Sequence, residues 1–297
     1  GGLVEQEQVG RAHQRLSQVQ AHPPATGEVA NAAVHLLVGE AQACQQLART
    51  GVGGIAVGAF QLTVQARQGG AIVGLLGRSQ VRALLQRELY HGAIKNTRNM
   101  HLHPLNLCIG EARAAESLGA LIFENSEVLE IIHGDTPGVR TAHGQIDASQ
   151  VMLAGDVYHK LEPGQLKGKI FPAMGGIVTT APLGDLAQQI NPEDLAVYDC
   201  RFVLDYYRLT ADGRLLFGGG ANYSGKDSRD IAAELRPCIG RTFPALKGVP
   251  IDYQWSCAMG IVINRIPQLG KLSDNVWYCQ GYSGHGIATT HIMGEIM

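Results

Sequence analysis

A strand, a glycine turn and the start of a helix are encoded together in Asn275-Val276-Trp277-Tyr278-Cys279-Gln280-Gly281-Tyr282-Ser283-Gly284-His285-Gly286-Ile287. The apolar and aromatic half predicts a buried strand, the glycines predict a tight turn, and residues 288–297 can continue as a helix. A helix N-terminus after such a turn presents unpaired backbone N–H groups and the positive end of the helix dipole. The pattern favours an electron-rich ligand at the turn, but an ordinary strand–turn–helix connection would have the same pattern.

The overall composition is that of a globular protein large enough for two domains. The chain has 297 residues, of which 45% are hydrophobic and 17% are charged. Its net charge of −2 and its pI of about 6.6 argue against nucleic acid or an anionic membrane as a partner. The oligomeric state stays open at this level.

The six cysteines, at positions 44, 108, 200, 238, 257 and 279, follow no metal-ligand spacing. We therefore expect reduced, mostly buried thiols in a cytoplasmic protein, and no metal site. The longest apolar stretches, 51–60 and 69–77, are too short and too rich in glycine to span a bilayer. The first residues show no basic region followed by an apolar one, so we expect no secretory signal.

Several motifs after residue 88 follow one another in the order and rough spacing of a known enzyme family. They are His101-Leu102-His103-Pro104-Leu105-Asn106-Leu107, residues 110–119, Val139-Arg140-Thr141-Ala142-His143-Gly144, residues 203–209 with 216–219, Asn222-Tyr223-Ser224-Gly225, and Asn264-Arg265. On these motifs the chain resembles FAD-dependent oxidoreductases of the D-amino-acid-oxidase-like superfamily, and among them the bacterial gamma-glutamylputrescine oxidoreductases.

The resemblance implies an α/β fold. In that fold an FAD/NAD(P)-binding Rossmann-like domain, here incomplete at its N-terminus, carries an inserted mixed-sheet substrate domain. Residues 87–158 and 266–297 would belong to the FAD-binding domain, and residues 159–265 to the substrate domain. Residues 1–86 stay unassigned.

Residues 1–86 differ from the rest in composition. No Lys and no Asp occur before Lys95, and no Trp or Tyr occurs before Tyr90, whereas average usage would give several Lys and Asp residues. The family begins with a strand, G-x-G-x-x-G, a helix and an acidic residue that binds the adenosine ribose. We therefore expect that this segment is not the usual family N-terminus. A frameshift, an assembly error or a truncation would each explain the change.

One short motif in this segment matches the dinucleotide-binding pattern on its letters alone. Gly51-Val52-Gly53-Gly54-Ile55-Ala56 fits G-x-G-x-x-A, but the preceding residues 41–50 are typical of a helix rather than a strand. No acidic residue lies between Glu40 and Glu88, so the ribose ligand is missing as well. A flexible segment rich in Gly and Val is the favoured interpretation.

Beyond residue 88 the local patterns predict regular elements. Pro104 and Gly119 bracket a helix with Leu105, Cys108, Ile109 and Ala112 on one face. The further predictions are strands at 121–124, 127–132 and 151–155, a hairpin of 139–142 and 145–147, strands at 169–180, 202–209, 214–219 and 251–263, and a helix at 231–243 interrupted at Pro237.

The resemblance also implies which residues contact FAD. Val128 would pack on the adenine, and Ala154 and Gly155 would let the backbone approach the ribose and pyrophosphate. The family usually has Asn where this chain has Asp156, and an added negative charge near a pyrophosphate is unfavourable. The resemblance further implies that the flavin ring is contacted by residues of the turn, namely Gly281, Tyr282, Ser283, Gly284, His285, Gly286 and Ile287. The backbone amides of 284–287 would face the N1/C2=O edge of the ring.

Four side chains are candidates for catalysis or substrate contact. His285 suits a general base, because an unperturbed imidazole titrates near neutrality, although the glycine turn alone would also position it. Tyr206 and Arg208 share one face of a strand, where Arg208 would bind a carboxylate or form an ordinary ion pair. Trp255 would line the pocket or belong to the core. The family follows this Trp with two glycines, and Ser256-Cys257 here would narrow the site.

Two classes of function follow from these observations. The first is an FAD-dependent amine oxidoreductase that oxidises the CH–NH group of gamma-glutamylputrescine or a related small-molecule amine, with oxygen as the expected acceptor. Within this class, a sarcosine/glycine or D-amino-acid oxidase-like enzyme is the alternative. The second class is a truncated, non-catalytic remnant that is unable to bind FAD.

Overall fold

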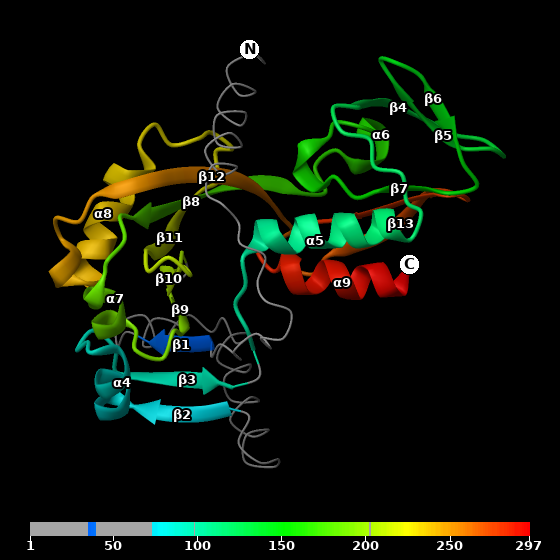
Figure 1. Cartoon of the computed structure of the whole chain (residues 1–297). Helices are drawn as coiled ribbons and strands as arrows, with labels where there is room; N and C mark the ends of the chain where they lie inside the picture. The colour runs from blue at the N-terminus through cyan, green and yellow to red at the C-terminus, as the bar shows by residue number, and fades with distance from the viewer. Residues whose placement is uncertain (1–34, 40–72, 98, 202) are drawn as a thin grey trace. The chain divides into compact units, whose positions relative to one another are not determined.

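The computed structural model describes residues 35–39, 73–97, 99–201 and 203–297 (Figure 1). The motif at Gly51–Ala56 and most of residues 1–86 therefore lie outside the described residues. Across the described ranges, strands arranged in three sheets are combined with helices, which agrees with the predicted α/β class. Among the helices in these ranges, none has the length and apolar content that crossing a bilayer requires.

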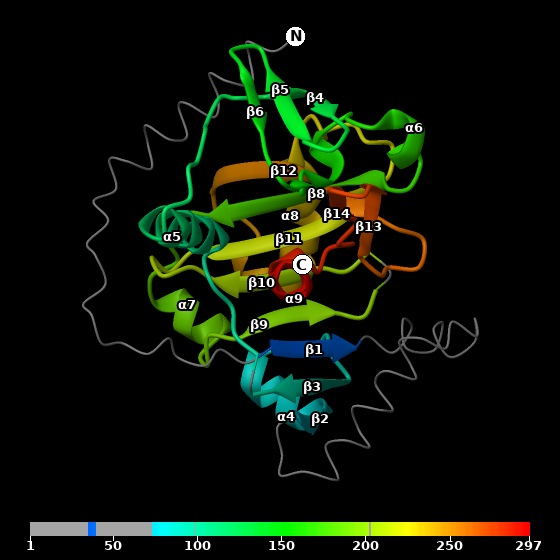
Figure 2. The same cartoon turned by 90° about the vertical axis from the view of Figure 1, so that its right-hand side faces the viewer.

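The largest sheet has eight strands in the order β12-β8-β11-β10-β9-β1-β3-β2, which Figure 2 shows from top to bottom. It is a mixed sheet, because β1 pairs parallel with β9 and the other neighbouring pairs are antiparallel. Its strands are β12 (Ile251–Ile261), β8 (Phe171–Thr180), β11 (Leu215–Asn222), β10 (Tyr206–Leu209), β9 (Ala196–Asp199), β1 (His35–Gly39), β3 (Gly92–Asn96) and β2 (Val73–Gly77).

One face of this sheet forms the main hydrophobic core. Val178, Tyr207 and Phe217 lie on that face with at most 2% of their surface exposed. Helix α8 (Ile231–Thr242) covers them with a stripe spaced by four residues, at Ile231, Leu235 and Ile239. Further helices near this sheet are α4 (Arg78–Leu85), α7 (Asp185–Ile190) and the short 3₁₀ helix η2 (Pro244–Leu246).

The expected break of helix α8 at Pro237 is wrong. The helix runs through Pro237 without interruption. A proline leaves the carbonyl four residues earlier without its N–H donor. Pro237 and Ala233 both lie on the exposed face of α8, so water can bind the Ala233 carbonyl there. The proline therefore costs less at this position than it would on the buried face.

Two smaller sheets share a second hydrophobic core. β14 (Val276–Gln280) pairs parallel with β7 (Val151–Leu153) and antiparallel with β13 (Gln268–Ser273). A three-stranded meander consists of β4 (Val128–Ile132), β5 (Gly138–Thr141) and β6 (Gln145–Asp147). The shared core contains Ile131, Val151, Leu153, Leu166, Val276 and Tyr278, where Leu166 comes from the short helix α6 (Pro163–Leu166).

Helix α5 (Pro104–Ser117) confirms the helix predicted between Pro104 and Gly119. His103 caps it by accepting a hydrogen bond from the Asn106 amide at Nδ1. The predicted apolar face is not buried among the described residues, since Leu105 is 42% exposed. The strand predicted at 121–124 is wrong, because these apolar residues adopt no regular structure and remain exposed. Their β-like composition finds no partner strand within the described ranges.

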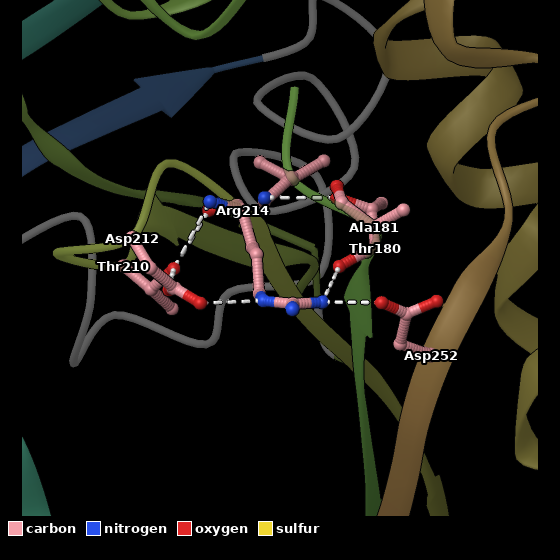
Figure 3. A network of polar contacts seen from close by, with 7 residues as sticks. Thr180, Ala181, Thr210, Asp212, Arg214 and Asp252 are labelled. Atoms are coloured by element: carbon pink, nitrogen blue, oxygen red, sulfur yellow. Dashed lines mark hydrogen bonds and ion pairs between the residues drawn. The ribbon is translucent and has the colours of Figure 1, made fainter. Parts of the chain in front are cut away.

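A polar network around Arg214 binds three strands of the large sheet together (Figure 3). Its guanidinium donates from Nε to Asp212 Oδ2 at 2.6 Å and from Nη1 to Asp252 Oδ2 at 2.5 Å. The same Nη1 donates to the Thr180 carbonyl at 3.0 Å, so β11 is joined to both β8 and β12. Although partial burial opposes it, hydrogen bonds from Thr210 and Arg214 lower the pKa of Asp212 below its ordinary value of 3.8.

We predict that Asp212→Asn lowers the free energy of unfolding at pH 7 by about 0.2–1 kcal/mol, because the Asp212 side chain is 61% exposed and solvent screens its charge. A carboxylate with a lowered pKa stabilises the fold above its ordinary pKa and loses that contribution as the pH falls through the lowered value. The difference between wild type and variant in urea unfolding should therefore shrink below about pH 4. Asp135→Asn, at an exposed side chain, is the control, and a difference that is as large at about pH 2 as at pH 7 would contradict the prediction.

Helix α9 (Gly286–Ile296) is tied to α5 by an ion pair between His291 Nε2 and Glu111 Oε1 at 2.6 Å. The Ile287 carbonyl first, and then Glu111, raise the pKa of His291 above its ordinary value of 6.5. A raised histidine pKa contributes stability below the ordinary pKa, and that contribution is lost as the pH rises through the raised value.

We predict that an NMR titration places the pKa of His291 above 6.5. In Glu111→Gln the pKa should fall but remain raised, because the hydrogen bond with the Ile287 carbonyl at 2.6 Å persists. Identical titration curves for wild type and Glu111→Gln would show that the ion pair does not form in solution.

Candidate functional site

Hydrogen bonds anchor the turn after β14 to Asp156 and to the end of β12. The Gly281 amide donates to Asp156 Oδ1 at 2.7 Å, and the Ser283 amide donates to the Gly260 carbonyl at 2.8 Å. The Ser283 hydroxyl accepts from the Val262 amide at 3.2 Å. Gly281 and Ser283 are buried, and both of their amides donate to protein acceptors.

Glycine is required at the first position of this turn. Gly281 has φ of +78°, and a Cβ there would lie 2.6 Å from Val262 Cγ1. Ser283 also adopts a left-handed conformation, with φ of +52°. The hydrogen bonds of its amide and hydroxyl hold it in this unfavourable region.

The other half of the turn keeps its amides available. Within the described part of the chain, the amides of Gly284, Gly286, Ile287 and Ala288 donate no hydrogen bond. They lie at and just before the N-terminus of α9, where the helix dipole is positive and the cap residue His285 makes no side-chain cap. Gly284, His285 and Ile287 are exposed. This half of the turn can therefore bind an electron-rich group.

His285 lies at the end of the turn with an exposed side chain. Its amide donates to the Tyr282 carbonyl at 2.9 Å, so the backbone position is set locally. Its ring makes no hydrogen bond with another described residue. Tyr282 itself is half-buried and its hydroxyl lies 3.0 Å from Cys279 Sγ. Burial first, and then this thiol contact, raise the pKa of Tyr282, so that its phenol stays protonated.

Strand register brings Tyr206 and Trp255 onto one face of the large sheet. Tyr206 pairs with Gly218, Gly218 pairs with Ile177, and Ile177 pairs with Trp255. Directly paired residues point to the same face, and their neighbours along each strand point to the other. Since the neighbours include Tyr207 on the α8 side, the row from Tyr206 to Trp255 lies on the opposite face. We call this face the open face of the sheet.

Tyr206 packs against Gly218, the residue opposite it on β11. A Cβ at Gly218 would overlap the Tyr206 ring, so the glycine makes room for the phenol. Burial raises the pKa of Tyr206 to about 12. The phenol is therefore a neutral hydrogen-bond donor at physiological pH.

Arg208 lies on the open face two residues after Tyr206 and is half-buried. Its Nη1 donates to the Leu209 carbonyl at 3.0 Å. Burial lowers the pKa of Arg208, and the charge of Asp194 opposes this effect only in part. Among the described residues, no carboxylate lies within salt-bridge distance of the Arg208 guanidinium.

The open face reaches the glycine turn through β12. Trp255, Cys257 and Met259 alternate along this strand and therefore share one face. A Cβ at Gly284 would meet Met259 Sδ at 3.9 Å, so the row ends beside the exposed half of the turn. Trp255 lies about 13 Å further along the strand. It is 41% exposed and does not belong to the core, so it is available to line a site.

The residues expected at the phosphate and adenine ends of the cofactor separate into two groups. Ala154 and Gly155 are exposed and directly follow β7, whose parallel partner β14 leads into the glycine turn. The two segments therefore leave the sheet at the same edge. Val128 is half-buried and packs against the second hydrophobic core, so part of its surface is covered by protein.

Asp156 and Tyr158 make contacts that sequence reasoning did not anticipate. Asp156 was expected to bring an unfavourable charge to the pyrophosphate, but both carboxylate oxygens accept backbone amides, from Gly281 and Gly260. Tyr158 binds the backbone of Ala258 through its hydroxyl. These contacts join residues 100 or more positions apart, and no local pattern signals them.

Comparisons with known proteins identify the family to which the chain belongs. Residues 8–297 match the DAO family, described as FAD dependent oxidoreductase. Gamma-glutamylputrescine oxidoreductase of Escherichia coli (strain K12) is 42% identical over 234 residues, which cover 78% of this chain and 55% of that protein. A probable oxidoreductase, OrdL, of Haemophilus influenzae is 34% identical over 75% of this chain and 52% of its own length. The chain thus spans about half the length of the curated relatives it matches.

Solved structures share the fold at low sequence identity. Glycine oxidase from Geobacillus kaustophilus superposes with a TM-score of 0.72 at 18% identity, covering 89% of this chain and 69% of that one. L-proline dehydrogenase from P. horikoshii gives 0.71 at 19% identity, covering 89% and 70%. With the family match over residues 8–297, these findings lead to one conclusion: the chain belongs to the DAO family of FAD-dependent oxidoreductases.

Proposed function

We propose that this chain acts with FAD to oxidise the CH–NH group of a small amine that carries a carboxylate at its far end. Gamma-glutamylputrescine or a related compound is the proposed substrate, and oxygen the proposed acceptor. The observation that carries the proposal is the set of unpaired amides at Gly284, Gly286 and Ile287, which border the open face at Met259. The Escherichia coli relative, 42% identical, supports the choice of substrate.

The residues present fit the isoalloxazine end of FAD. Unpaired amides at a helix N-terminus stabilise the negative charge that a reduced flavin carries at its N1/C2=O edge. A Cβ at Gly284 would have only Met259 Sδ within 4 Å, so nothing in the described residues crowds this position. Ala154 and Gly155 are exposed at the same sheet edge, where the ribose and pyrophosphate would follow.

Two-electron oxidation of the substrate C–N bond is the chemistry that FAD supplies when bound. The chain's own residues would bind and orient the amine. Met259 and Trp255 would pack against the aliphatic chain of the substrate and exclude water from it. The neutral Tyr206 phenol would donate a hydrogen bond to the substrate. A ring nitrogen of the exposed His285 would take the proton that the substrate ammonium must lose before oxidation.

The position of Arg208 favours a substrate with widely separated amine and carboxylate. β10, which carries Arg208, lies three strands from β12, or about 14 Å across the sheet. In sarcosine, glycine or a D-amino acid, the carboxylate is attached close to the carbon that is oxidised and would need a cation beside the turn. Trp255, Cys257 and Met259, the row that reaches the turn, contain no cation. The separation therefore supports a gamma-glutamyl amine over the short amino acids.

The first test is the visible spectrum and peroxide release of the purified chain. We expect retained or added FAD to give the flavin absorption bands, and peroxide to form with gamma-glutamylputrescine faster than with sarcosine, glycine or D-amino acids. A folded, colourless protein that ignores added FAD would instead identify the non-catalytic remnant. Faster turnover of sarcosine, glycine or D-alanine would contradict the substrate assignment alone.

The second test concerns Arg208. In Arg208→Met we expect KM for gamma-glutamylputrescine to rise about 10- to 100-fold, because a charge-assisted hydrogen bond to the carboxylate is lost. Turnover of putrescine, which lacks the carboxylate, should change little. Arg229→Met, at an exposed arginine on the same domain, is the control. An equal loss with both amines would show that Arg208 does not bind the carboxylate.

A further inference from the structure

The Asp156 carboxylate lies where three segments of the candidate site meet. Asp156 begins the 3₁₀ helix η1 (Asp156–Tyr158), directly after the exposed Ala154 and Gly155. Its Oδ1 accepts from the amide of Gly281, the first residue of the glycine turn, at 2.7 Å. Its Oδ2 accepts from the Gly260 amide, next to Met259 on β12, at 2.9 Å.

The residues around Asp156 leave space for its side chain and use both of its carboxylate oxygens. A Cβ at Gly260 would overlap it, so this position of β12 can hold only glycine while Asp156 is in place. Asp156 itself adopts a left-handed conformation with φ of +49°, which a non-glycine residue rarely adopts. Since two amides donate to two different oxygens, both acceptors of a carboxylate are used. A side-chain amide has only one acceptor oxygen and could satisfy only one of the two.

Tyr158 of the same 3₁₀ helix binds β12 two residues earlier. Its hydroxyl donates to the Ala258 carbonyl at 3.1 Å and accepts from the Ala258 amide at 3.0 Å. β12 is an edge strand, and residues 258 and 260 present their backbone groups on the side away from β8. Side chains of η1 therefore occupy the free edge of β12. Of the two η1 side chains, Asp156 also binds the glycine turn, whereas Tyr158 binds β12 alone.

We propose that Asp156 is a positioning residue for the flavin-facing turn. By binding Gly260 and Gly281 at once, it fixes the turn, with its unpaired amides at Gly284, Gly286 and Ile287, against the row that ends at Met259. Its negative charge is then used to accept hydrogen bonds from two backbone amides and does not repel the cofactor phosphates. The statement about FAD rests on the proposed function above, whereas the attachment of the turn to β12 stands on the hydrogen bonds alone.

Hydrogen exchange of the backbone amides tests the attachment, and FAD titration tests its consequence. In Asp156→Ala we expect exchange at Gly260 and Gly281 to accelerate at least about 10-fold, because both amides lose a charged acceptor. In Asp156→Asn only one of the two amides should remain protected. The dissociation constant for FAD should rise about 10-fold or more in Asp156→Ala, and the midpoint potential of bound FAD should become more negative.

Two controls separate positioning from general destabilisation. Tyr158→Phe removes the bonds to Ala258 and should leave Gly281 protected and the flavin potential unchanged, while Asp274→Asn, at an exposed side chain, should change nothing. Faster exchange without a change in FAD affinity or potential would overturn the positioning role. Unchanged exchange at Gly281 would overturn the attachment itself. If the wild type bound no FAD, the proposed function would fail, and the exchange rates would still decide the attachment.

Discussion

The candidate site depends on the hydrogen bonds that hold the turn after β14 against β12. β14 pairs parallel with β7, and the turn that follows is bound to β12 by the Ser283 amide and hydroxyl and through Asp156. These bonds consume the amides of Gly281 and Ser283 and leave those of Gly284, Gly286 and Ile287 unpaired within the described residues. Because the turn is hydrogen-bonded to β12, its unpaired amides lie beside Met259 on that strand.

Local sequence patterns predicted the elements whose causes are local. The helix after Pro104, the hairpin at 139–147 and the final strand–turn–helix all depend on neighbouring residues, and each forms. The strand predicted at 121–124 fails because a strand needs a partner, which composition does not reveal. Pro237 fails to end its helix because the cost of a proline depends on which face is exposed.

The candidate site was predictable only in part. Alternation along a strand is sufficient to place Tyr206 and Arg208 on one face. That Trp255 joins them depends on the register of β10, β11, β8 and β12, which follows from pairing over long distances in the chain. Asp156 shows the limit most clearly. Its charge suggested a conflict with the cofactor, whereas its two amide partners lie 104 and 125 residues away.

The central claim is that the exposed half of the turn faces the electron-rich edge of the flavin. The most direct measurement is the ¹H–¹⁵N NMR spectrum of the labelled chain during titration with FAD. The account predicts that the amide signals of Gly284, Gly286 and Ile287 shift the most, while those of Gly281 and Ser283, already bound to protein, move little. Saturable binding that leaves the signals of Gly284, Gly286 and Ile287 in place would contradict it.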